Sequence, residues 1–182
     1  MPSNTTQYGW PYPLSSDLVR DGAEAIEDLA KAVEDTFSGT ILQVVTGTTS
    51  TVTANATNNY EDTGVTATIT PTATTSKVLA IAEHYINVDG STSKYLGIRL
   101  LRGATVIHEP VADATGPYDF GDNTYFNTRA SVTVLDSPST TSATTYKTQF
   151  RRYGAGGTVR VNGDGSQTQA STSRIILMEV AE

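Results

Sequence analysis

The chain has 182 residues, no cysteine and a formal net charge of −7. The absence of cysteine excludes disulfides, thiolate catalysis and cysteine-based zinc sites. The acidity disfavours a nucleic-acid partner, because phosphate binding requires clustered Lys and Arg. No apolar run approaches the roughly 20 residues of a membrane-spanning helix, so we expect no membrane insertion.

The acidic residues are concentrated near the N-terminus. Seven of the 19 acidic residues, but only two of the 12 basic ones, lie within residues 1–39. The remainder of the chain is nearly neutral and rich in Thr and Ser, which suits half-buried strands. We therefore divide the chain into a short segment (1–14), a helix (15–39) and a β module (40–182).

Residues 1–14 are expected to form an extended segment that binds another surface. Two prolines fix φ near −65° and disfavour helix in the residues before them. The segment has three aromatic residues, including the single Trp, which are too few to form a core. They therefore need a partner surface, on this domain, on a sister chain or on a larger assembly. The alternative is a disordered tail. The candidate anchor residues are Tyr8, Trp10, Pro11, Tyr12, Pro13 and Leu14.

A helix is predicted from about Asp17 to Phe37, with Ser15, Ser16 or Asp17 as its cap and Gly39 as its stop. Its apolar residues recur every seven positions, which is typical of a coiled coil. An isolated helix of this length is marginal in water, so its apolar stripe must be buried. It packs either on its own β module or on identical helices. The candidate interface residues are Val19, Gly22, Ile26, Leu29 and Val33.

From Thr40 onward the apolar pattern changes to alternation, which predicts strands. Turn signals such as Asp89-Gly90 and Arg102-Gly103 separate these strands. Because no second helical pattern follows, we expect a mainly β protein whose helix precedes a jelly-roll-like β-sandwich. The predicted strands are Ile41–Val45, Val65–Thr70, Lys77–Val88, Tyr95–Leu101, Thr105–His108, Ala130–Leu135, Thr145–Tyr153, Thr158–Val161 and Arg174–Val180.

The longest irregular stretch, residues 110–128, is a candidate ligand loop, because long loops often carry function. Its aromatic rings could stack on sugars while its carboxylates bind hydroxyl groups. Alternatively, the rings close the end of the sandwich or fill an interface between chains. The residues concerned are Asp113, Tyr118, Asp119, Phe120, Asp122, Tyr125 and Phe126.

No motif in the sequence indicates catalysis, so we expect no enzyme, no cofactor and no metal site. His84 and His108 lack the spacing of metal ligands, and each is expected to be a strand residue with a hydrogen-bonded ring. The glycine-rich run at 154–157 lacks the Lys-Ser/Thr of a phosphate loop. Asp164 lacks the closing Glu of a calcium loop.

Several segments, in order, resemble structural proteins of tailed bacteriophages. Residues 8–13, 17–23 and the helix resemble the N-terminal module of minor tail or fibre proteins, which looks like a virion-attachment segment. Later segments resemble the C-terminal domains of phage fibres. These later segments are Ile41–Val45, Ile69–Pro71, Thr75–Leu79, Leu135–Pro138, Thr145–Phe150 and Ser173–Val180.

The resemblance implies a virion appendage, a short fibre or spike on tail, neck or head, that contacts the host surface. Such proteins are commonly homotrimers, bind other virion proteins and are assembled in the host cytoplasm. Possible host ligands are glycans or proteins. One alternative is a capsid decoration or head fibre with no receptor role. A second alternative is a polysaccharide-degrading tail enzyme.

Overall fold

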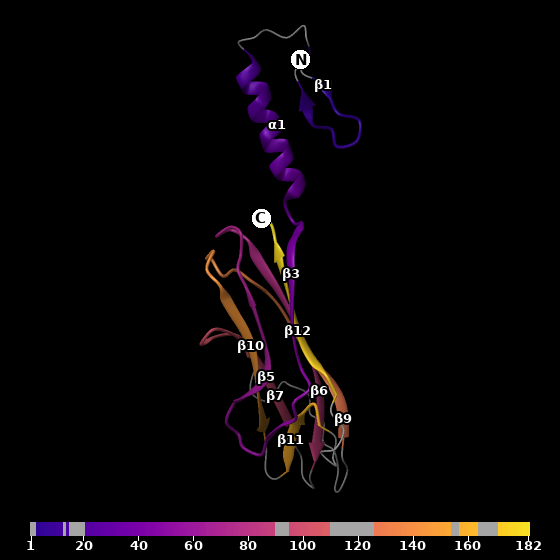
Figure 1. Cartoon of the computed structure of the whole chain (residues 1–182), viewed down its shortest axis with the longest axis vertical. Coiled ribbons are helices and arrows are strands. Elements are labelled where there is room, and N and C mark those ends of the chain that lie inside the picture. The colour runs from indigo at the N-terminus through magenta and orange to yellow at the C-terminus, as the bar shows by residue number, and fades with distance from the viewer. Residues whose placement is uncertain are drawn as a thin grey trace. The chain divides into compact units, whose positions relative to one another are not determined.

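The computed structural model describes residues 3–12, 14, 21–89, 95–109, 126–153, 157–163 and 171–182. The chain forms two compact units. Unit 1 comprises Met1–Thr40 and Ala181–Glu182, and unit 2 comprises Ile41–Val180 (Figure 1).

Unit 1 consists of a small hairpin and one helix. Strands β1 (Ser3–Asn4) and β2 (Pro11–Tyr12) pair antiparallel. A turn joins them, and Gly9 adopts a positive φ of 70° in this connection, as glycine does at little steric cost. Between the two strands the chain folds back: Thr5 donates its backbone N–H to the Trp10 carbonyl (2.8 Å), and Trp10 donates its N–H to the Thr5 hydroxyl (2.9 Å). Residues 3–12 therefore form a hairpin instead of the expected continuous extended segment.

The helix α1 spans Gly22–Phe37, with Asp21 at its N-cap position. The proposed caps Ser15, Ser16 and Asp17, together with Val19, lie outside the described residues. At the other end, Gly39 takes a positive φ of 78° and donates its backbone N–H to Ala181 (2.8 Å), while Ala181 donates to Thr40 (2.9 Å). The predicted stop at Gly39 is confirmed, because its left-handed backbone cannot continue the helix.

Unit 2 is built from two antiparallel sheets. The first contains β3 (Ile41–Thr49), β12 (Ser173–Val180), β6 (Lys77–Asp89), β9 (Phe126–Asp136), β11 (Thr158–Val161) and β4 (Thr53–Asn55). The second contains β5 (Glu61–Ile69), β10 (Thr144–Tyr153), β7 (Tyr95–Arg102) and β8 (Thr105–His108). The long strand β6 pairs with β9 on one edge and with β12 and β11 on the other.

The strand pairing is nested, as in one long hairpin folded over on itself. The pairs are β3 with β12, β5 with β10, β6 with β9, and β7 with β8. Successive pairs alternate between the two sheets, which is the topology of a jelly roll. The expected jelly-roll-like β-sandwich is confirmed, with β4 and β11 as additions.

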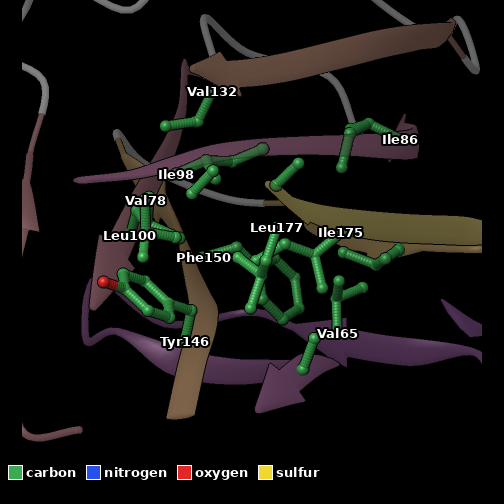
Figure 2. Packing of buried hydrophobic residues seen from close by; sticks show 14 of the residues in the cluster. Val65, Val78, Ile86, Ile98, Leu100, Val132, Tyr146, Phe150, Ile175 and Leu177 are labelled. Atoms are coloured by element: carbon green, nitrogen blue, oxygen red, sulfur yellow. The ribbon is translucent and has the colours of Figure 1, made fainter. Parts of the chain in front are cut away.

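The core lies between the two sheets (Figure 2). The rings of Tyr146 and Phe150 from β10 are fully buried among aliphatic side chains of the first sheet, such as Ile175 and Leu177 on β12. On β6, alternate residues from Val78 to Val88 are buried, as the alternation predicts. This period of two places one face of each strand in the core.

All nine predicted strands are present, and several are longer than predicted. Strand β9, for example, begins at Phe126 instead of Ala130, because pairing with β6 extends it through polar residues. The sequence did not indicate β4, whose three residues pair with β11. So short a strand shows no alternation, and only its partner stabilises it.

Candidate functional site

Most of the described anchor residues belong to the hairpin of unit 1. The rings of Tyr8 and Trp10 stack with centroids 5.0 Å apart. Trp10 Nε1 donates to Thr36 Oγ1 of α1 at 2.9 Å, so this ring already has a partner within the chain. Tyr8, Tyr12 and Leu14 remain exposed, Pro11 is half-buried in β2, and Pro13 lies outside the described residues.

Two parallel stripes of α1 differ in exposure. The first contains Ala25, which is buried, Leu29 and Ala32, which are half-buried, and Thr36, which accepts the bond from Trp10. The hairpin thus contacts α1 at the Thr36 end of this stripe. The second stripe, which we call the open stripe, contains Ile26, Ala30, Val33 and Phe37.

The open stripe remains accessible in a single chain. Ile26 is 67% exposed and Phe37 is 54% exposed. Leu29 is half-buried in the stripe that contains Thr36, the partner of Trp10, and Val33 is half-buried in the open stripe. Gly22 is half-buried at the first position of the helix. Of the proposed interface residues, Ile26 and Val33 belong to the open stripe.

Most of the candidate ligand loop lies outside the described residues. This applies to Asp113, Tyr118, Asp119, Phe120, Asp122 and Tyr125, whereas the backbone of Phe126 begins β9. The strand β9 that follows this loop begins beside the end of β6, where Phe126 pairs with Val88. This end of unit 2 is opposite to the end where Lys77 pairs with Val180.

Three of the segments that resemble phage fibres meet at Glu179. This buried carboxylate accepts hydrogen bonds from Gln43 Nε2 (2.5 Å) and from the backbone N–H and hydroxyl of Thr72 (both 2.7 Å). Gln43 also donates to the carbonyl of Thr70 at 2.7 Å. Burial opposes ionisation of Glu179, but the bonds from Gln43, Thr72 and Ser76 outweigh it and lower its pKa to about 2.

A second cluster links the two sheets. Asp136 on β9 accepts hydrogen bonds from Tyr146 on β10 (2.7 Å) and from Arg102 on β7 (2.8 Å). Burial and the neighbouring carboxylate of Asp136 raise the pKa of Tyr146, so its hydroxyl remains a donor. Both clusters hold the fold together, and neither places a nucleophile beside a base.

The outer face of the second sheet is polar. The guanidinium carbons of Arg99 and Arg151 lie 4.0 and 4.6 Å from the ring centroid of Tyr60. Arg99 also donates twice to Gln149 (2.7 and 2.9 Å), which in turn donates to Asp62 (2.8 Å). Such cation–π contacts hold the two arginine side chains against the tyrosine ring.

The two histidines differ in environment. His84 on β6 is fully buried, and neither ring nitrogen has a hydrogen-bond partner among the described residues. The expected hydrogen-bonded ring is therefore wrong for His84, because the inward side of β6 is lined by apolar residues such as Ala82 and Ile86. Burial lowers the pKa of His84 to about 4. His108 is exposed on β8.

Within the described ranges, no group of three or more His, Cys, Asp or Glu residues could hold a metal ion. None of the described helices is both long and apolar enough to span a membrane.

No protein-family profile and no curated protein matches the chain. VP2 of infectious bursal disease virus, as a D431N mutant in T=1 particles, is 15% identical with a TM-score of 0.39 over 76% of this chain. VP2 of the Gx strain is 12% identical (TM-score 0.38, 76% of this chain), and latent PorU from Porphyromonas gingivalis is 10% identical (TM-score 0.37, 78% of this chain).

The chain spans 36–37% of the length of these VP2 chains and 14% of that of PorU. Likeness at this level carries no argument about function.

Proposed function

We propose that this protein is a structural appendage of a tailed-bacteriophage virion, a short fibre or spike on tail, neck or head. It has no catalytic role in this proposal. It forms a homotrimer, attaches to another virion protein through residues 1–14 and contacts a glycan or protein of the host surface. The ordered set of fibre-like segments supports the class of protein.

The observation that carries the assembly part of the proposal is the open stripe of α1. Ile26 and Phe37 expose apolar surface on a helix of 16 residues, and such a helix is marginal in isolation. Burial of this stripe against identical helices removes the exposed surface from water. The seven-residue spacing of Ile26 and Val33 fits such a bundle.

Light scattering on the purified full chain tests the assembly. We expect an oligomer with the mass of a trimer at micromolar concentration, and we expect Ile26→Asp to dissociate it while the β signal in circular dichroism persists. Glu27→Gln is the matched control, because Glu27 is exposed beside Ile26 and pairs only with Lys31 (2.6 Å) among the described residues. A persistent wild-type monomer would contradict the proposal.

The exposed rings of Tyr8 and Tyr12 support the attachment role, because they leave aromatic surface for a virion protein. Deletion of residues 1–14 should leave a soluble oligomer that no longer enters particles. Trp10→Phe retains an aromatic ring and loses only the bond to Thr36, so this control should still incorporate. Normal incorporation of the truncated chain would refute the attachment role.

The location on the particle distinguishes an appendage that binds the host from a capsid decoration. Reconstruction of an intact particle tests this point. A position on the tail or neck, or with the 110–128 loop pointing outward, supports host contact. A position flat on the capsid, with this loop buried between neighbouring subunits, supports the decoration.

A further inference from the structure

The outer face of the first sheet carries an unusual apolar area. In register across four strands, Val44 pairs with Met178, Met178 with Leu79, and Leu79 with Leu135. In the next outward-facing row, Ile176 pairs with Ile81. These residues alternate with buried ones such as Ala80 and Leu177, so their side chains lie on the solvent side. We call Val44, Leu79, Ile81, Leu135, Ile176 and Met178 the outer patch.

The outer patch is open in a single chain. Val44 and Leu135, at its two edges, are each 56% exposed, and the other four residues are half-buried. An antiparallel sheet with one face on the core normally has a polar opposite face. The outer face of the second sheet, with Arg99 and Gln149, follows this rule, and the outer patch breaks it.

The apolar character is confined to one half of the sheet. The following outward row contains Glu83 and Arg174, which form an ion pair at 2.6 Å, with Ser131 beside Glu83 on β9. The outer patch thus occupies the half where β3 begins and β12 ends. Because Glu83 and Arg174 neutralise each other, no net charge borders the patch on this side, whereas the row on its other side contains Val180 and Lys77. The surface that complements the patch itself is apolar.

The size of the patch argues for a second copy of this chain. Four strands about 4.8 Å apart and two rows about 7 Å apart give an area on the order of 200 Å². A stable interface buries about 800 Å² on each partner, so the patch needs a second contact between the same two molecules. The open stripe of α1 is such a contact, and association through it raises the effective concentration of the patches.

We propose that the outer patch packs against another copy of the chain, so that the β-sandwiches take part in the oligomer together with the helices. This inference rests on the oligomer of the proposed function. The patch then contributes to assembly and leaves the polar face around Tyr60 free for solvent.

The test compares Leu135→Glu with Ser131→Glu in the full chain. Both residues are exposed on the outer face of β9, four positions apart, and both changes introduce the same charge. We expect Leu135→Glu to weaken association by about tenfold or more in sedimentation equilibrium. Ser131→Glu places its carboxylate opposite Glu83 and so lowers the melting temperature somewhat, but it keeps the wild-type association constant. Melting curves recorded for both variants below the association range check that each one folds.

A second measurement uses the absence of cysteine, which allows a single spin label at a chosen site. A label at Thr133→Cys, at the edge of the patch, should be immobilised in the oligomer and become mobile when Ile26→Asp is added. A label at Arg129→Cys should be mobile in both backgrounds.

The outcomes separate the proposed oligomer from the proposed role of the outer patch. A monomeric wild type overturns the oligomer and this inference together. A wild-type oligomer in which Leu135→Glu behaves as Ser131→Glu, with a mobile label at Thr133, overturns this inference alone.

Discussion

Tyr146 donates a hydrogen bond of 2.7 Å to Asp136 and thereby ties β10 in the second sheet to β9 in the first. Tyr146→Phe removes this donor while Arg102 still pairs with the carboxylate. A hydrogen bond to a charged group contributes about 1.5–3 kcal/mol, so we expect a loss of that size in urea unfolding. Tyr85→Phe, on the outer face of β6, is the control and should change stability by less than about 0.5 kcal/mol. Equal losses in the two variants would contradict the prediction.

Glu179→Gln should destabilise the protein by about 2 kcal/mol at pH 7, because an amide cannot accept from the donors on both of its sides. The pKa of Glu179 is lowered to about 2 in the folded chain. Its contribution is therefore complete above pH 4.5 and is lost as the pH falls towards 2. The difference between wild type and variant in urea unfolding should shrink over this range. A difference that stays constant from pH 5 to pH 2.5 would count against this role.

His84 should make the protein sensitive to mild acid. Its folded pKa of about 4 lies below the ordinary value of 6.5, so the unfolded chain binds the proton first as the pH falls. The contribution of neutral His84 to the free energy of unfolding is fully present above pH 6.5. It decreases towards pH 4 by on the order of 3 kcal/mol. His84→Leu should flatten this slope in denaturant unfolding between pH 7 and 4.5, and His108→Gln should keep it. The same slope in all three proteins would rule out His84 as its source.

Gly47→Ala should be strongly destabilising. A Cβ at this position would lie 1.8 Å from the carbonyl oxygen of Thr66, so β3 would have to move away from β5. Overpacking against backbone costs about 3 kcal/mol or more. Gly22→Ala, where a Cβ meets nothing within 4 Å, should instead be neutral or stabilising by up to about 1 kcal/mol. Thermal unfolding of the two variants checks the opposite signs.

Substitution of the tyrosines in the 110–128 loop distinguishes a host-binding loop from a buried, structural one. If they bind the host, Tyr118→Ala or Tyr125→Ala should reduce adsorption to host cells and leave the melting temperature unchanged. If they are buried, truncation should cost on the order of 3–5 kcal/mol, as for other buried aromatic residues. A melting curve and an adsorption assay on the same variants distinguish the outcomes.

The sequence by itself determined the β class, the strands and the inward faces, because alternation is a local property of each strand. Val78, Ala80 and Ile86 could be assigned to the core from their spacing alone. The same spacing puts His84 on the inward face of its strand, but it does not show that the ring lacks a hydrogen-bond partner among the described residues. The end of α1 was also predictable, because Gly39 determines it locally.

The tertiary structure decided which distant residues meet. Glu179 and Gln43 are 136 positions apart, and nothing in either segment indicates that one carboxylate holds both Gln43 and Thr72. The outer patch arises in the same way. Alternation along β6 puts Leu79 and Ile81 on the outward face, but it does not show which residues lie beside them there. Only the register of β6 with β12 and β9 aligns them with Met178 and Leu135, since strand pairing is a long-range property that no local pattern contains.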